Sequence, residues 1–321
     1  MSDDIRKAAE TLAGATVRSV VPAKIGGNSQ IFCVETAAAR FALKVYPTRA
    51  GDPRNRADIE WRALQFLTSR GLTTVPKPGA RDPVGRFLLM EWVDGVAVTA
   101  HRPGEIPQAA DFIAEIFALS GDPEAQEFPL ASEACLSAAE IVRQIDARLP
   151  LLIADPEIDR FLDRTFRPLL AKARTEIHDG GDLPNPLRRL IPADFGFHNT
   201  LRQANGRLRY IDFEYFGWDD PVKLTADFLL HPAMQLGSAD RRYFTHRMTE
   251  ALPGDGEFVV RLRRLLPLFA LRWMLILLNP FRQDRAKELS AAPGQREALR
   301  QNRLAKAQAL VEWVAGDATA G

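Results

Sequence analysis

The feature that most constrains this chain of 321 residues is a short hairpin pattern with polar side chains at both of its ends. Two strand-like runs, 200–202 and 208–211, flank a turn at 204–206 that reads Ala-Asn-Gly. Asn-Gly between strand-like runs is a strong signal for a β-hairpin, because both residues tolerate the positive φ of a tight turn. A tight hairpin brings its two ends side by side. Asn199 and Asp212 are therefore predicted to be neighbours.

A second carboxylate, Asp194, precedes the hairpin by a few residues. Carboxylate and amide oxygens suit Mg²⁺, which takes one or two protein oxygens and completes its octahedron with phosphates and water. A carboxylate that is not bound to the metal can orient or deprotonate an attacking hydroxyl. Segment 192–214 therefore predicts a magnesium–phosphate site, with a chance Asp–Asn–Asp spacing on an ordinary hairpin as the alternative.

This segment resembles the catalytic loop of the aminoglycoside phosphotransferase and choline kinase families. That loop reads roughly His-Gly-Asp-x-x-x-x-Asn, and a second Asp follows it after a hairpin. The resemblance implies that Asp194 is the catalytic base and that Asn199 and Asp212 hold Mg²⁺. One departure is that Pro192 stands where these families have the loop histidine. In the relatives that histidine mainly supports the loop, so the departure concerns the local geometry.

Asp194-Phe195-Gly196 also spells the triplet that carries the magnesium-binding Asp of protein kinases. If Asp194 had that role, the catalytic loop would lie upstream, around 178–179 or 182–185. The glycines and prolines at 180, 181, 184 and 186 would break a pair of strands there, and Asn185 leaves no room for a hairpin before Asp194. We therefore assign the second acidic role to Asp212.

Residues 1–93 are predicted to form a small, five-stranded antiparallel lobe with one helix, which would bind the nucleotide. Strands are expected at 17–21, 31–36, 40–46 and 87–93. The turn between the first two contains Gly26, Gly27, Asn28 and Ser29. A glycine pair lets backbone N–H groups approach a phosphate closely. A plain hairpin connection is an equal alternative.

Lys44 lies inside the otherwise apolar strand 40–46. A lysine there is costly to bury unless it is paired, and the alternative is an edge-strand lysine that faces water. In the resembling families this strand lysine contacts the nucleotide phosphates and pairs with a helix glutamate. The implied partner here is Glu60, with Asp58 as the second candidate.

Glu60 and Asp58 belong to a helix that is predicted to open at Asp52-Pro53 and to end near Gly71. Beyond this helix, the strand 87–93 is followed by Asp94-Gly95. The resemblance implies that backbone groups around Glu91 and Val93 read an adenine edge at this point.

Residues 94–321 are predicted to form a larger, mainly helical lobe that carries the catalytic hairpin and the acceptor site. The expected helices are 109–119, 133–149, 156–178, 224–236, 241–252, 258–278 and 296–314. Asp227 resembles the loop-supporting carboxylate of the family, although three extra positions separate it from the preceding proline. Glu214 is predicted to be one of two things, a further metal or water ligand, or a solvated acid at the end of a strand. His198 is a phosphate-positioning or a structural residue.

Composition excludes several classes of protein. A net charge of +1 gives no sign of attraction to nucleic acid or to a membrane. Two distant cysteines favour free thiols in a reducing cytoplasm. The N-terminus lacks a signal-peptide pattern, and the apolar run 273–278 is too short to span a bilayer. The expected location is the cytoplasm, and the sequence gives no oligomeric state.

Together these features predict an α+β, bilobal, protein-kinase-like fold. The implied reaction is transfer of the γ-phosphoryl group of ATP, or GTP, to a hydroxyl of a small molecule such as a sugar, amino sugar, aminoglycoside or amino alcohol. Protein kinase activity is disfavoured, because no Ala-Pro-Glu motif or long activation segment follows Asp212. A nucleotide-binding pseudokinase that acts as an interaction module is the alternative, because Pro192 replaces the loop histidine.

Overall fold

The structure is a computed structural model, and the part of the chain that it describes is 3–25, 29–47, 55–177, 180–282 and 293–315. The chain forms two compact units. Unit 1 consists of Met1–Ser132 and Leu190–Gly217, and unit 2 consists of Glu133–Arg189 and Trp218–Gly321. These units differ from the lobes 1–93 and 94–321 that the sequence predicts, because residues 94–132 and the catalytic hairpin pack within unit 1. The division of roles between two lobes stays a prediction.

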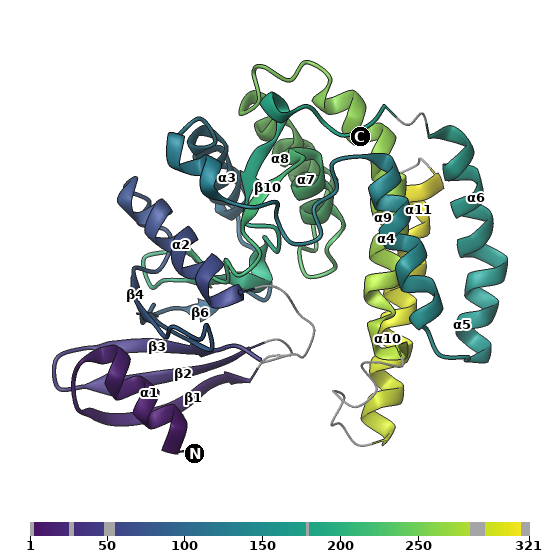
Figure 1. The fold of residues 1–321 in the computed structure, drawn as a ribbon. Helices are drawn as coiled ribbons and strands as arrows, with labels where there is room; N and C mark the ends of the chain where they lie inside the picture. Colours follow the sequence, from purple (N-terminus) through teal and green to yellow (C-terminus); the bar gives the residue numbers. More distant parts are fainter. Residues whose placement is uncertain (1–2, 26–28, 48–54, 178–179, 283–292, 316–321) are drawn as a thin grey trace. The chain divides into compact units, whose positions relative to one another are not determined.

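Unit 1 contains a five-stranded antiparallel sheet in the order β1-β2-β3-β5-β4 (Figure 1). Its strands are β1 (Val17–Ile25), β2 (Gln30–Thr36), β3 (Arg40–Val45), β4 (Pro78–Arg81) and β5 (Phe87–Glu91). The predicted antiparallel sheet is thus confirmed, with boundaries that shift by a few residues. Strand β3 lies in the middle, where Lys44 is paired with Ile31 on one side and Leu88 on the other.

Unit 1 has a second helix on its sheet that the sequence analysis did not predict. Helix α1 (Asp3–Ala13) buries Ala9 completely against a core that includes Val34 and Leu43. Ile5 and Leu12 of the same helix pack against this core. Positions 5, 8, 9 and 12 recur with helical spacing, so the pattern was present in the sequence.

Helix α2 (Arg56–Ser69) begins later than the Asp52-Pro53 start that the sequence predicted. Residues 52 and 53 lie outside the described ranges, and the N-cap is Asn55, whose side chain accepts a hydrogen bond from the Asp58 backbone N–H at 3.1 Å. The end of α2 agrees with the prediction, since Gly71 follows with a φ of +86°. The buried face of α2 contains Glu60, Ala63, Leu64 and Leu67.

The predicted catalytic hairpin is present in unit 1 as β8 (Thr200–Arg202) and β9 (Leu208–Tyr210). It forms a three-stranded sheet in the order β6-β8-β9 with β6 (Val96–Ala97), and its turn contains Gly206 with a φ of +81°. Helix α3 (Glu105–Leu119) supports it in two ways. Phe112 stacks on Tyr210 with ring centroids 4.1 Å apart, and Glu105 forms a buried ion pair with Arg202. Two 3₁₀ turns complete the unit, η1 (Pro123–Glu127) and η5 (Phe197–Asn199).

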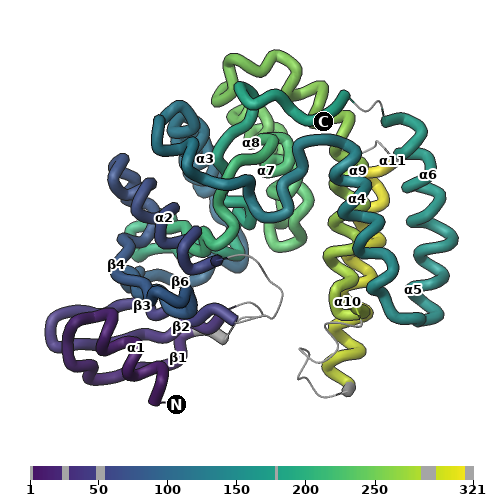
Figure 2. The backbone as a smooth tube through the Cα atoms, viewed as in Figure 1, coloured from purple at the N-terminus to yellow at the C-terminus, as the bar shows by residue number. Residues whose placement is uncertain are grey.

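Unit 2 is mainly helical, as predicted. Its helices are α4 (Ala138–Arg148), α5 (Pro156–Phe161), α6 (Arg167–Glu176), α7 (Pro221–Leu230), α8 (Ser238–Glu250), α9 (Phe258–Leu277), α10 (Pro293–Ala309) and α11 (Val311–Ala315). Figure 2 shows α4, α10 and α11 alongside the long helix α9. No helix among the described residues combines the length and the apolarity needed to cross a membrane.

Several boundaries in unit 2 correct the sequence analysis. Helix α4 begins at Ala138 instead of residue 133, because Ser137 caps it and Glu133 has a positive φ of 57°. Helix α7 begins at Pro221 after the N-cap Asp220, and it ends at Leu230. The predicted helix 156–178 is interrupted by a π-helical segment, η3 (Leu162–Phe166).

The remaining short elements connect these helices. They are the 3₁₀ turns η2 (Leu149–Leu151), η4 (Asn185–Leu187) and η6 (Asn279–Phe281), and the paired strands β7 (Arg189–Ile191) and β10 (Gly217–Asp219).

Candidate active site

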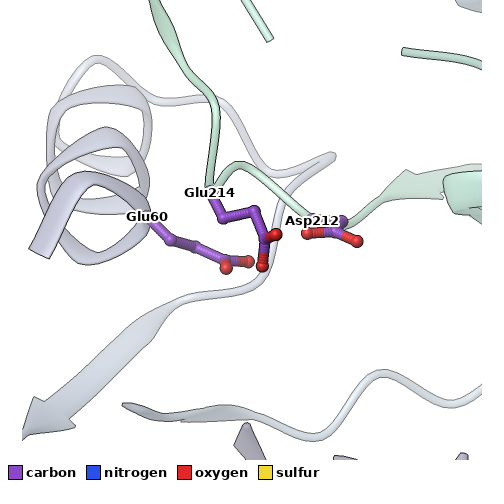
Figure 3. Close-up of side chains that lie close together, drawn as sticks. All are labelled: Glu60, Asp212 and Glu214. Atoms are coloured by element: carbon purple, nitrogen blue, oxygen red, sulfur yellow. The ribbon is translucent and has the colours of Figure 1, made fainter. Parts of the chain in front are cut away.

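A buried cluster of charges in unit 1 is centred on Lys44 of β3. Its Nζ atom lies 2.5 Å from Glu60 Oε2, 2.6 Å from Asp212 Oδ1 and 3.1 Å from Glu214 Oε2. Figure 3 shows the three carboxylates directed toward one another from α2 and from the segment after β9. Lys44 is only 2% exposed. Lys44 thus has carboxylate partners, which offset the free-energy cost of burying its charge inside a strand.

The surrounding carboxylates keep Lys44 charged. Burial alone would lower its pKa, but the charges of Asp212 and Glu60 outweigh burial and hold the pKa of Lys44 well above its usual value. Glu60 is fixed by two further donors, since Tyr46 donates to its Oε2 at 2.5 Å and the Phe213 backbone N–H to its Oε1 at 3.2 Å. Burial, followed by the charge of Glu60, raises the pKa of Tyr46 well above its usual value. Tyr46 therefore stays a donor.

Glu214 is the member of this cluster that sequence reasoning left open. It is 3% exposed, so it is not a solvated acid, and its Oε1 lies 3.2 Å from Arg56 Nη1. Among the described residues, three carboxylates face two cations, which leaves an excess of negative charge in this part of the cluster. One carboxylate oxygen from each of Glu60, Asp212 and Glu214 lies within 4.8 Å of the other two. Oxygen donors at this spacing suit a hard divalent cation such as Mg²⁺.

The hairpin places Asn199 and Asp212 at the same end, as predicted. The Asn199 carbonyl accepts a hydrogen bond from the Ile211 backbone N–H at 3.0 Å. The Asn199 side chain donates to the Asp194 carbonyl at 2.9 Å, which links the hairpin to the loop before it. Asp212 has a φ of +74° and Ala193 a φ of +62°. Positive φ is uncommon outside glycine and tends to occur at functional sites.

Asp194 is in a more open environment than the Lys44 cluster. Its carboxylate is 44% exposed, and Oδ1 lies 3.0 Å from His198 Nε2. The loop is held by backbone contacts, because the Pro192 carbonyl accepts from the Asp194 N–H at 2.8 Å. The Gly196 carbonyl in turn accepts from the Thr200 hydroxyl at 2.9 Å. A carboxylate that is oriented but accessible is suited to receive a proton from a bound molecule.

The structure answers the question of which acid pairs with Lys44. Glu60 is the partner, whereas Asp58 pairs with Arg81 at 2.8 Å. Sequence reasoning did not find Arg56 and Tyr46, which complete the cluster. Tyr46 lies two positions from Lys44, directly after β3, and alternate residues of an extended chain share a face, which was an available signal.

The remaining nucleotide-site candidates are less informative. Gly26, Gly27 and Asn28 lie outside the described residues, and Ser29 is half-buried just before β2. The Glu91 carboxylate accepts hydrogen bonds from the Lys77 backbone N–H and from Arg209, both at 2.9 Å. Val93 is buried. The roles of these residues in nucleotide binding stay predictions.

Unit 2 contains a second group of buried charges. Asp227 accepts hydrogen bonds from Trp273 Nε1 at 2.7 Å and Lys223 Nζ at 2.8 Å, and its predicted support of the catalytic loop stays a prediction. Asp219 is fully buried, and its Oδ1 accepts from the backbone N–H groups of Cys135 and Asp220, both at 2.8 Å. Burial, only partly offset by Lys223, raises the pKa of Asp219 to about 7.

Comparison with known proteins agrees with the fold and the motifs. The family model described as the phosphotransferase enzyme family (APH) matches residues 20–252. This match covers most of the chain, which therefore belongs to that family of enzymes. The predicted resemblance is confirmed. No curated protein matches the sequence.

Solved structures show the same fold at low identity. A putative aminoglycoside phosphotransferase from Ralstonia eutropha has 16% identity and a TM-score of 0.62, with 97% of this chain and 96% of that chain covered. The choline kinase LicA from Streptococcus pneumoniae has 18% identity and a TM-score of 0.61, with 97% and 99% covered. Aminoglycoside phosphotransferase APH(4)-Ia has 17% identity, a TM-score of 0.61 and 99% of each chain covered. The predicted kinase-like α+β fold is thus confirmed.

The raised pKa of Asp219 predicts a specific pH dependence of stability. A carboxyl whose pKa rises from 3.8 to about 7 on folding stabilises the fold at low pH, and this contribution is lost as the pH rises through that interval. Asp219→Asn removes the titration. Its stability relative to the parent chain should therefore increase by on the order of 4 kcal/mol between about pH 3 and pH 8.

Urea unfolding across this pH range measures the difference. Asp163→Asn is the matched control, because the Asp163 side chain is 71% exposed in the same unit, and its difference from the parent should stay flat. A flat profile for Asp219→Asn as well would contradict the assignment.

Proposed function

We propose that this enzyme transfers the γ-phosphoryl group of ATP, or of GTP, to a hydroxyl group of a small molecule. The observation that carries the proposal is the pairing of buried Lys44 with Glu60 and Asp212, next to a hairpin whose preceding loop exposes Asp194. A buried ammonium with an excess of surrounding carboxylate is suited to a ligand that brings both phosphates and a divalent cation.

Asp194 acts as the base in this proposal. Its exposed carboxylate takes the proton of the acceptor hydroxyl as the oxygen attacks phosphorus, while the contact with His198 Nε2 orients it. The Asn199 amide, bonded to the Asp194 carbonyl, fixes the backbone from which the carboxylate projects. In this proposal the hairpin thus positions the Asp194 carboxylate through the hydrogen bond between Asn199 and the preceding loop.

Asp212 and Asn199 would hold Mg²⁺, and Glu214 is a further carboxylate of the same cluster. When bound, the ion would neutralise the charge that develops on the transferring phosphoryl group. Lys44 donates hydrogen bonds to the phosphates, and Glu60 keeps its ammonium in place. Arg56 keeps the Glu214 carboxylate in place through their ion pair.

Relatives with the same fold support the choice of substrates. The structures include LicA in complex with AMP and APH(4)-Ia in a ternary complex with AMP-PNP and hygromycin B. Others contain gentamicin or spectinomycin. Two of these structures, those with hygromycin B and with spectinomycin, hold an adenine nucleotide together with the small molecule, and we propose the same pair of substrate classes here. The acceptor is a sugar, amino sugar, aminoglycoside or amino alcohol.

The first test is nucleotide binding followed by turnover. Mg·ATP or Mg·GTP should raise the melting temperature, because a ligand at a hundredfold excess over its dissociation constant stabilises the folded state by about 2.7 kcal/mol. Nucleotide consumption should then require one member of a panel of hydroxylated metabolites. Binding without any turnover would favour the pseudokinase alternative, and the absence of a thermal shift with both nucleotides would remove the kinase assignment.

The second prediction separates the base from the metal ligand. Asp194→Ala should lower kcat by roughly 10²–10⁴-fold, the range for loss of general-base assistance, with nearly unchanged nucleotide affinity. Asp212→Ala should abolish turnover and weaken Mg-dependent nucleotide binding. Calorimetry with and without Mg²⁺ distinguishes the two effects. The reverse pattern would mean that Asp194 has the metal-binding role of the Asp-Phe-Gly triplet.

The third prediction concerns the coupling between Lys44 and Glu60. In a double-mutant cycle of Lys44→Met and Glu60→Gln, the affinity for Mg·ATP should show a coupling on the order of 0.5–3 kcal/mol, as for residues in contact. Lys44→Met alone should cost more, since it also removes the phosphate contact. The same cycle with Asp58→Asn is the control and should be additive. Additivity for Glu60 as well would sink the assigned pairing.

A further inference from the structure

Unit 2 contains a cavity of about 330 Å³, and none of the residues assigned above to the nucleotide, the base or the metal ion lines it. Residues of helices α7, α8, α9 and α11 line it. Its wall on α8 consists of positions 238, 241, 242, 245 and 249, and its wall on α9 of positions 259, 262, 263 and 266. Both series have helical spacing, so one face of each helix forms a wall of the cavity.

The interior of this cavity is apolar. Leu229, Leu262, Leu266 and Trp313 line it, and each is less than 10% exposed. The volume lies within the range of pockets that hold small organic molecules. The cavity can therefore accommodate an apolar group of moderate size.

Three arginines, Arg241, Arg242 and Arg263, also line the cavity, and none of its lining residues is Asp or Glu. The Arg241 guanidinium stacks on the Trp313 ring at 4.6 Å, while its buried Nε has no hydrogen-bond partner. Within the described ranges no ion pair involves any of the three. His246, which also lines the cavity, has Glu250 as its acidic neighbour at 3.3 Å.

Among the described residues that line the cavity, no side chain carries a negative charge. The buried Nε donor of Arg241 has no partner among the described residues, which carries a desolvation cost, and no carboxylate among the described lining residues offsets the three guanidinium charges. The planar guanidinium group matches carboxylate and phosphate oxygens in a bidentate way. A ligand with an oxyanion head and an apolar body would satisfy both the arginines and the leucines.

We propose that this cavity is a binding site for a small organic anion, with its carboxylate or phosphate on Arg241, Arg242 and Arg263 and its apolar body on Leu262, Leu266 and Leu229. All of these residues belong to unit 2, whereas the Lys44 cluster belongs to unit 1. The site shares no residue with the Lys44 cluster or with Asp194, so binding here can be measured separately from phosphotransfer.

The test is isothermal titration calorimetry on the full chain with four probes. Phenyl phosphate and benzoate supply the two anionic heads on an apolar ring, phenol supplies the ring alone and inorganic phosphate the head alone. We expect saturable binding of at least one aryl anion, with phenol and inorganic phosphate markedly weaker. The comparison of phenyl phosphate with benzoate identifies the preferred head.

Variants locate the binding. Arg242→Ala and Arg263→Ala should each weaken it about 10-fold or more, the loss expected for a charge-assisted hydrogen bond. Both side chains are exposed, so these variants should fold normally, which circular dichroism checks. Arg264→Ala, at the adjacent exposed position outside the cavity, and Lys44→Met should leave the affinity unchanged. Failure of both aryl anions to bind, full affinity in the Arg242 and Arg263 variants, or loss of binding in Lys44→Met would each overturn the proposal.

Discussion

The organisation of unit 1 depends on the burial of one ammonium group among three carboxylates. Lys44 comes from β3, Glu60 from α2, and Asp212 and Glu214 from the segment after β9. Removing these charges from water is costly, and their mutual contacts compensate only when all partners are in place. The five-stranded sheet, α2 and the hairpin must therefore be positioned together, because a displacement of any one would leave a buried charge without its partner.

Sequence reasoning succeeded where the determining signals are local. The Asn-Gly turn specifies the hairpin, and the hairpin alone brings Asn199 and Asp212 to one end. The choice of Glu60 over Asp58 came from a family resemblance, and the geometry explains it. Glu60 shares the buried face of α2 with Ala63 and Leu64, whereas Asp58 is turned toward Arg81. Helical periodicity could have separated the two acids without any resemblance.

The failures have two physical origins, competing local signals and contacts between distant parts of the chain. The start of α2 depends on capping by Asn55, for which Asp52-Pro53 offered a competing local signal. The burial of Glu214 depends on Arg56, which is far away in sequence. The sequence alone therefore could not distinguish a metal or water ligand from a solvated strand-end acid at this position. The same holds for Asp219, whose partners include the Cys135 backbone. Burial of an acid is a tertiary property.

Net charge is a poor guide to a chain in which charges are segregated this strongly. The net charge of +1 suggests a surface without a strong preference for anions or cations. Yet the described residues of unit 1 concentrate an excess of carboxylates around Lys44. In unit 2, three arginines line one cavity that has no acid among its described lining residues. Each local excess is costly in isolation and favourable with a ligand of opposite charge, a cation in the first case and an anion in the second. Summation over the whole sequence cancels the two. The chemistry that each site can bind is therefore found in its uncompensated charge and not in the total.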